Sequence, residues 1–256
     1  LSKFVFEALM SLLFVIFFLY KWEGRIGALV LSLIFISFVG FSYLKKENLL
    51  KGKFDIKKLK EMVVLGSPLL VLEFSTAISA ISDRFFIEHF LGLSQTGVYG
   101  VAFLVASIVL VSVSSLTNVF RPLIYNKIQN YPQDKKSLSL ISLQHHISLL
   151  ALTILIVCVL KKIIFAYFID VKFSASEELV WPMACGFFFW GLNVFYLSYF
   201  IFEKESKIIF IVSIFHILST VLLNYLFIPV YGLMGASYTP LITNFFGSII
   251  VFVLFH

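Results

Sequence analysis

The last 49 residues, Ile208 to His256, read IIFIVSIFHILSTVLLNYLFIPVYGLMGASYTPLITNFFGSIIVFVLFH and contain no Lys, Arg, Asp or Glu. A helix needs about 20 largely apolar residues to cross a bilayer, so this run is too long for one crossing and must fold back once. The reversal is expected between Pro229 and Gly235, because proline cannot extend a helix and glycine accepts the backbone angles of a tight turn. The stretch therefore predicts two membrane helices joined by a short turn.

The rest of the chain has the same character. Of 256 residues, 60% are hydrophobic and only 13% are charged, and the mean hydropathy is +1.00. A soluble domain carries about 25% charged residues, so a surface this poor in charge could not be hydrated. Six further apolar runs are bounded by charge, at residues 4–20, 26–44, 62–82, 92–120, 138–160 and 179–202. We therefore expect an all-α, polytopic transmembrane helical bundle of about eight spans.

The positions of lysine and arginine in the connecting segments predict the orientation. If Lys3 is cytoplasmic, the cytoplasmic side receives fourteen of these residues and the other side receives five, leaving out Arg84 within a span. Cytoplasmic loops are enriched in Lys and Arg, so both ends of the chain are expected in the cytoplasm. The chain begins at Leu1 without a signal-peptide pattern, which is typical of a fragment of a longer membrane protein.

The densest lysines lie between the second and third spans, at residues 45–60. Ile56, Leu59 and Val63 fall there at helical spacing, so this segment is either a short interfacial helix on anionic lipid or a solvated loop. Because the basic residues are otherwise scattered over separate loops, the net charge of +6 is a topology signal, and no nucleic-acid partner is expected.

The loops are too short for a catalytic domain. The largest outer loop is roughly 170–178, and its charges, Asp170, Glu177 and Glu178, are most simply solvated. The sequence contains no Walker loop, dinucleotide fingerprint, metal-ligand spacing or Gly-x-Ser-x-Gly elbow. We therefore expect a transporter-like bundle that is not an enzyme and holds no metal or cofactor.

Ionisable residues concentrate in the third span and its continuation, where Glu73, Asp83, Arg84 and Glu88 occur. Such a side chain costs about 2.5–3.5 kcal/mol or more in hydrocarbon, which makes it a functional hypothesis by default. At 100° per residue Glu73 and Arg84 differ by only 20°, and Ala77, Ala80 and Glu88 fall near the same line. One stripe of this helix is therefore small and charged, as expected of a helix that lines a cavity.

Simpler interpretations of these charges stay open. Arg84 and Glu88 could pair at i,i+4 near the outer interface and extend into the headgroups. Glu73 is either neutral or paired with a residue of another span, and a proton- or ion-coupling role is the sharper alternative. Arg121, before Pro122, is either an interface anchor or a second contact for an anion. His145 and His146 are expected to make interhelical hydrogen bonds.

Several motifs resemble one family. Gly66-Ser67-Pro68, Ser82 to Ile87, Phe90-Leu91-Gly92 and Thr96 to Tyr99 resemble the middle of Wzx-type polysaccharide flippases, which are relatives of the MATE exporters in the MOP superfamily. The late motifs resemble the Asn…Ile-Pro-x-Tyr-Gly-x-x-Gly-Ala signature of the same superfamily, and they comprise Leu223-Asn224-Tyr225, Ile228-Pro229, Tyr231-Gly232 and Gly235-Ala236. Trp22-Glu23-Gly24-Arg25 with Gly27 is similar to the entry to its sixth helix.

The resemblance implies that the chain corresponds to helices five to twelve of a twelve-helix, two-lobe transporter. Residues 1–44 would then be the last two helices of the N-terminal lobe, 45–61 a cytoplasmic basic linker, and 62–256 the C-terminal six-helix lobe. Gly66, Pro68, Pro229, Gly232 and Gly235 would serve as hinge or turn residues.

The implied function is translocation of undecaprenyl-diphosphate-linked oligosaccharide across the bacterial inner membrane for O-antigen, capsule or exopolysaccharide synthesis. Arg84 is the expected contact for the diphosphate or an acidic sugar, with Arg25 and Arg121 behind it. Glu73, Asp83 and Glu88 are the coupling or gating candidates for an H⁺ or Na⁺ gradient. The implied partners are the lipid-linked oligosaccharide, membrane lipids, and the polymerase and ligase proteins of the same synthesis.

Two alternatives remain. A MATE-type multidrug or cation antiporter would need an acidic cavity without arginine, so Arg84 facing the lumen disfavours it and Arg84 facing lipid headgroups would favour it. A membrane-bound glycan polymerase would need a long outer loop that carries arginines and catalytic groups, and the sequence has none.

Overall fold

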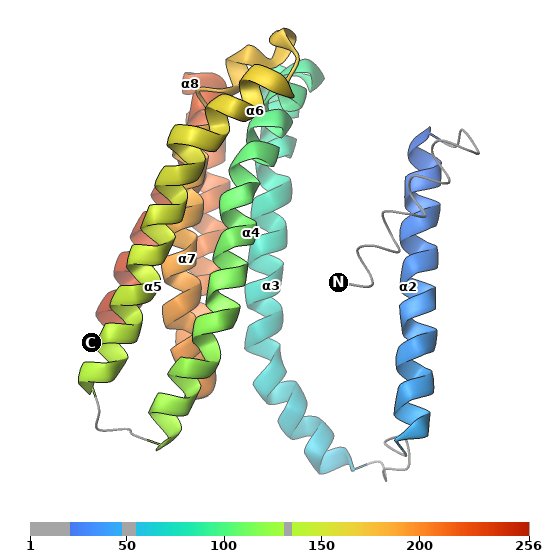
Figure 1. The fold of residues 1–256 in the computed structure, drawn as a ribbon, viewed down its shortest axis with the longest axis vertical. Coiled ribbons are helices and arrows are strands. Elements are labelled where there is room, and N and C mark those ends of the chain that lie inside the picture. The colour runs from blue at the N-terminus through green and yellow to red at the C-terminus, as the bar shows by residue number, and fades with distance from the viewer. Residues whose placement is uncertain (1–20, 48–54, 131–134, 256) are drawn as a thin grey trace. The chain divides into compact units, whose positions relative to one another are not determined.

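The computed structural model describes residues 21–47, 55–130 and 135–255, which form helices and no strand (Figure 1). The chain divides into two compact units, residues 1–59 and 60–256. In the first unit, α2 (Lys21–Lys46) is a single apolar helix. The expected first span, 4–20, lies outside the described residues.

Helix α3 (Ile56–Leu91) is longer than the third span expected from the sequence. Its arms Ile56–Val64 and Gly66–Leu91 meet at an angle of 41°. Pro68 explains the bend, because proline lacks the N–H that would bond to the carbonyl of Val64 and its ring crowds that carbonyl. The lysine-rich segment is therefore helical from Ile56 onward, which favours the helical interpretation over a loop for this part.

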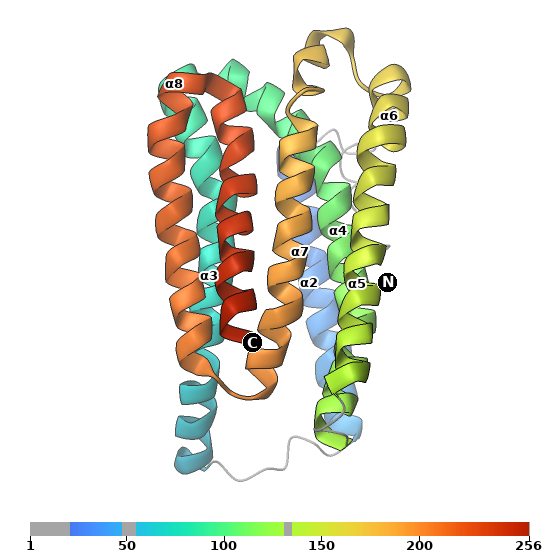
Figure 2. The same ribbon diagram turned by 90° about the vertical axis from the view of Figure 1, so that its left-hand side faces the viewer.

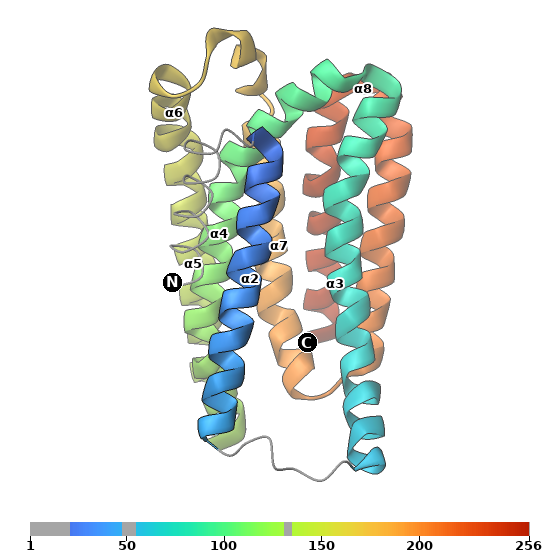
Figure 3. The same cartoon turned by 90° about the vertical axis from the view of Figure 1, so that its right-hand side faces the viewer.

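The second unit is a bundle of helices that run along one axis (Figures 1 and 3). Helix α4 (Leu93–Asn130) continues ten residues past the end expected at Phe120, through Pro122. The next span is one rod made of α5 (Lys135–Leu155), a π-helical turn, η2 (Ile156–Leu160), and α6 (Lys161–Tyr167). A short 3₁₀ helix, η3 (Val171–Ser176), then leads to α7 (Val180–Phe202).

Helix α8 (Ser206–Phe255) is two antiparallel arms joined at a sharp turn (Figure 2). Gly232 breaks the helix with φ 60° and ψ −140°, angles that glycine adopts without a steric cost. Gly235 is packed so tightly that an added Cβ would lie 2.4 Å from the carbonyl oxygen of Phe227. The reversal predicted between Pro229 and Gly235 is therefore confirmed.

By length and composition, five described helices could cross a membrane, or six when the two arms of α3 count as one span. This number counts α8 as one helix, although the break at Gly232 divides it into two arms that each count as one crossing. In the described residues, seven of the eight predicted spans thus have a helix, and the fold class is the expected all-α bundle.

Three apolar clusters hold the second unit together along its length. Helix α7 packs against both α4 and α8 and so lies at the centre of the bundle. Gly186 of α7 lets the backbones approach, because an added Cβ would lie 2.8 Å from the backbone nitrogen of Leu241. Figure 2 shows the lysine-bearing turn between α7 and α8 at one end of the unit and the α6–η3 segment at the other.

Candidate functional site on helix α3

Helix α3 has three faces, which become distinct when successive residues are placed 100° apart around the helix axis. One face is packed against α4 and α8 and carries Ser75, Ser79, Ser82 and Asp83. A second is the stripe of small and charged residues expected from the sequence, which we call the charged stripe; it comprises Glu73, Ala77, Ala80, Arg84 and Glu88. A third is exposed and wholly apolar, and it comprises Phe74, Ile78, Ile81 and Phe85.

Asp83 lies on the packed face, where it is only 7% exposed. The Tyr99 hydroxyl of α4 donates a 2.6 Å hydrogen bond to Asp83 Oδ2, and Asn224 Nδ2 of α8 donates one of 2.6 Å to Asp83 Oδ1. Tyr99 and Asn224 are themselves 1% and 0% exposed. A single carboxyl group therefore joins three helices inside the bundle.

The polar contacts between α3 and the first arm of α8 continue one turn below Asp83. Asn224 Nδ2 also donates to Ser82 Oγ at 3.2 Å. Ser79 Oγ lies 3.1 Å from His216 Nδ1 and donates to Thr220 Oγ1 at 3.3 Å. Residue numbers rise together on both helices, so the two are parallel and share a polar seam, defined here as Ser79, Ser82 and Asp83 with His216, Thr220 and Asn224.

Arg84 is half-buried at the edge of the charged stripe. Its Nη1 donates a 2.8 Å hydrogen bond to the carbonyl oxygen of Ala80, and its guanidinium carbon lies 4.7 Å from the centre of the Phe103 ring of α4. Both contacts draw the guanidinium one turn back along α3, toward the middle of the span. An arginine that extended into the outer headgroups would point the opposite way.

The charges of α3 therefore do not form the single cluster that the sequence suggested. Asp83 is turned 100° from Arg84, because the two are consecutive on a helix, and it lies on the packed face. In the described part of the chain no ion pair joins Arg84 to Glu88, so the alternative of an i,i+4 pair is not seen there. The side chains of Glu73 and Glu88 are exposed on the second unit. Among the described residues, neither carboxylate has a partner from another span.

The two other candidate arginines lie elsewhere. Arg121 Nε donates a 3.3 Å hydrogen bond to Ser198 Oγ of α7, so this residue is half-buried between two helices of the bundle. The backbone of Arg25 belongs to α2, and its side chain lies outside the described part of the chain. Gly66 and Pro68 lie at the bend of α3, and their role as hinge residues stays a prediction.

Sequence reasoning missed the partners of Asp83. Tyr99 was noted only as part of a motif. Asn224, as a single polar residue on a helix, predicts a hydrogen bond between helices but not its partner. Both side chains converge on α3 from other helices. One signal was available: Ser75, Ser79 and Ser82 recur at i, i+4 and i+7, which predicts a polar face on α3. Among the described residues, no group of three or more His, Cys, Asp or Glu could hold a metal ion.

No family model matches the chain, and neither does any curated protein. Its fold is similar to a solved structure described as the outward-facing conformation of a multidrug resistance MATE family transporter of the MOP superfamily. The TM-score is 0.75 at 15% identity, over 99% of this chain and 59% of that one. A second solved structure, described as the crystal structure of a MATE mutant, gives a TM-score of 0.70 at 15% identity, over 99% and 60%.

These likenesses show the fold and nothing finer. The chain spans about 60% of the length of the MATE structures that it matches. Its apolar helices, arranged in this fold, make it a multi-pass membrane protein.

Proposed function

We propose that the chain belongs to a transporter that moves undecaprenyl-diphosphate-linked oligosaccharide across the bacterial inner membrane, for O-antigen, capsule or exopolysaccharide synthesis. The MATE-like fold supports membrane transport, and the motifs around Arg84 support this class of cargo. The lysine distribution supports cytoplasmic termini. The polymerase and ligase proteins of the same synthesis are the partners that would receive the cargo.

The observation that carries the proposal is the placement of Arg84. A diphosphate crossing hydrocarbon needs a cationic, hydrated lane, whereas its polyprenyl tail can stay in lipid. Arg84 holds its guanidinium toward the middle of the span and has no acidic partner hydrogen-bonded to it in the described residues. Arginine binds phosphate oxygens through two parallel N–H groups, so this charge is suited to an anionic cargo.

The polar seam offers a physical basis for coupling to a proton gradient. Asp83 accepts two hydrogen bonds, while Asn224 Oδ1 is buried without a hydrogen-bond partner among the described residues. When Asp83 takes up a proton, its new O–H can donate to Asn224 Oδ1 if the amide turns by 180°, and the Ser82 hydroxyl can then donate to the same oxygen. The contact between α3 and α8 thus has two hydrogen-bonded states that differ by one proton.

A MATE-type multidrug or cation antiporter is the second candidate, and two observations favour it. The two similar solved structures are MATE proteins, one of them described as a multidrug resistance transporter, and Glu73 and Glu88 are exposed carboxylates on the charged stripe. Arg84 on the same stripe opposes it, because a guanidinium repels an organic cation. A glycan polymerase is less favoured still, since the connection from α6 to α7 is only a short 3₁₀ helix and two turns.

The test replaces Arg84 in the gene at its own locus. We expect Arg84→Ala to reduce surface polysaccharide by at least about a hundredfold without lowering the amount of protein, because two charge-assisted hydrogen bonds to phosphate contribute roughly 1.5–3 kcal/mol each. Arg84→Lys should keep a fraction of the activity, since lysine keeps the charge and loses the paired geometry. Lys207→Ala removes one exposed cation elsewhere and should change neither quantity.

Normal surface polysaccharide in the Arg84→Ala strain would contradict the proposal. Resistance to cationic dyes that depends on Glu73 and persists without Arg84 would instead support the antiporter.

A further inference from the structure

Helix α3 begins with a short arm, Ile56–Val64, that meets the rest of the helix at an angle of 41°. The other arm, Gly66–Leu91, is about 39 Å long at 1.5 Å per residue, which already exceeds the roughly 30 Å of hydrocarbon in a bilayer. The short arm therefore lies at the membrane surface. Figures 2 and 3 show this end of α3 extending past the turn between α7 and α8.

The short arm is a capped helix whose side chains are all exposed. Asp55 Oδ1 accepts hydrogen bonds from the backbone N–H groups of Lys57 at 2.9 Å and Lys58 at 3.3 Å, which fixes the start of the helix. All nine residues of the arm are exposed, and its exposed apolar side chains include Ile56 at 73%, Met62 at 70% and Val63 at 60%. An exposed apolar patch of this kind marks a surface that meets a partner or a membrane.

The arm separates its apolar and charged side chains onto two faces. At 100° per residue, the apolar face comprises Ile56, Leu59, Met62 and Val63, within a sector of about 120°. Lys58 and Lys60 lie about 40° beyond the two edges of this sector, one on each side. Lysines in this position can lay their carbon chains along the apolar face and extend their ammonium groups to headgroups.

The positive charge of the arm is only partly neutralised by the described residues. The arm has three lysines, Lys57, Lys58 and Lys60, against one carboxylate, Glu61, and the structure shows no ion pair for any of these lysines in the part of the chain that it describes. The Asp55 carboxylate is occupied by backbone N–H groups.

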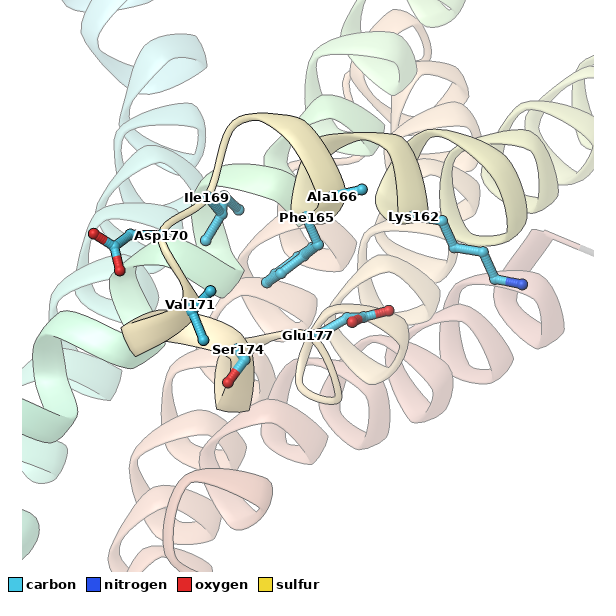
Figure 4. Close-up of a pocket in the computed structure, with 8 residues that line it drawn as sticks. All are labelled: Lys162, Phe165, Ala166, Ile169, Asp170, Val171, Ser174 and Glu177. Carbon is cyan, nitrogen blue, oxygen red and sulfur yellow. The ribbon is translucent and has the colours of Figure 1, made fainter.

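The lysines at the far end of the bundle differ from those of the arm. Lys161 Nζ lies 3.4 Å from Glu177 Oε1, and Lys172 Nζ lies 3.8 Å from Asp170 Oδ2. Figure 4 shows Lys162 pointing away from the cavity of about 380 Å³ at that end. The lysines of the arm are therefore the ones that are combined with an exposed apolar face and free of acidic neighbours among the described residues.

We propose that the short arm of α3 lies on the membrane and binds its anionic phospholipids, of the phosphatidylglycerol type. The apolar face enters the boundary between headgroups and acyl chains, and Lys58 and Lys60 contact phosphates on either side of it. The membrane is the occupant that fits, because the arm continues directly into a helix that crosses it and because an anionic surface complements the lysines. This surface is independent of what the protein transports.

The test measures the depth of the arm in bilayers of two compositions. In a background with Cys158 and Cys185 replaced by serine, a spin label is attached either at Val63→Cys on the apolar face or at Glu61→Cys, which lies 160° away on the charged face. The full chain is reconstituted at one copy per lipid disc, in pure phosphatidylcholine or in equal parts of phosphatidylcholine and phosphatidylglycerol. Collisions with a neutral, water-soluble nickel complex report exposure to water.

The Val63 label should be at least about fivefold less exposed to the nickel complex in the anionic bilayer, because each lysine near an anionic surface contributes about this factor to binding. The Glu61 label should stay accessible in both bilayers. Lys58→Gln with Lys60→Gln should remove most of the difference at Val63. Lys204→Gln with Lys207→Gln removes two exposed lysines from the turn between α7 and α8 and should leave the difference unchanged. Thermal unfolding should be the same in both double variants.

A Val63 label as accessible as the Glu61 label in both bilayers would overturn the proposal, because the arm would then be solvated. Equal protection of Val63 in the two bilayers would overturn the anionic preference. If protection instead required two copies of the chain in one disc, the apolar face would bind a second copy and the lipid assignment would be wrong.

Discussion

The packed face and the charged stripe of α3 place their ionisable groups in opposite environments. On the packed face, Asp83 is 7% exposed and each carboxylate oxygen accepts a hydrogen bond from another helix. On the charged stripe, Glu73 and Glu88 are exposed. Among the described residues, Arg84 is held by a carbonyl of its own helix and by the Phe103 ring. The two faces belong to one helix and lie less than half a turn apart.

This difference distinguishes residues that hold the helices together from residues that are available to contact a transported molecule. A buried polar group needs a partner inside the protein, so a carboxyl group with two short hydrogen bonds holds helices together. A charged group on a membrane helix that has no protein partner must meet water, a ligand or another part of the protein. We therefore propose that the packed face holds the bundle together and switches it, and that the charged stripe serves the proposed transport.

The largest expected effect comes from replacing the carboxyl group of the packed face. Asp83→Leu leaves the Tyr99 hydroxyl and one N–H of the Asn224 amide buried without an acceptor, which should lower the free energy of unfolding by about 3 kcal/mol. Glu73→Leu is the matched change on the charged stripe and should leave stability unchanged or slightly raised. Thermal unfolding in one detergent would compare the two, and equal losses would refute the distinction between the faces.

A smaller loss of stability is expected at the partner helix. Asn224→Leu removes the donor to both Asp83 and Ser82, and we expect a cost of about 2 kcal/mol. Asn118→Leu is the control, because Asn118 is exposed on α4. If both asparagines proved equally dispensable in the same unfolding assay, the polar seam would have no structural role.

The smallest effect on stability is expected from Asp83→Asn, below about 1 kcal/mol, because the amide can donate to Asn224 Oδ1 as the protonated acid would. The same variant should lose the response of transport to a pH gradient, since its side chain no longer exchanges a proton. Reconstituted vesicles with and without a pH gradient would measure this response. A full response in the variant would exclude Asp83 as the coupling group.

Most of the fold could be predicted from the sequence, because bilayer thickness sets the length of each apolar run. The reversal at Gly232 could be predicted because the charge-free run is too long for one crossing and contains proline and glycine residues. The continuation of α4 beyond Phe120 could not be predicted, because polar residues outside the bilayer can extend a helix without an apolar signal. The bend of α3 followed from Pro68.

Only part of the candidate site could be predicted. Helical spacing places Glu73, Arg84 and Glu88 on one stripe, and all three lie within helix α3. Helical spacing could not show that the Asp83 side chain contacts Tyr99 and Asn224, since those contacts span 16 and 141 positions in sequence. His145 also differs from expectation: it is buried against the rings of Phe120 and Phe195, without a hydrogen bond in the described part of the chain.

The accessibility of the charged stripe to water tests the central claim most directly. In a background with Cys158 and Cys185 replaced by serine, single cysteines at Ala77 and Ala80 would be compared with cysteines at Ile78 and Ile81 on the apolar face, using a charged thiol reagent on intact vesicles. We predict that the first pair reacts at least about tenfold faster, and that undecaprenyl-diphosphate-linked oligosaccharide slows its reaction. Equally slow reaction at all four positions would mean that the stripe faces lipid, and would contradict the account.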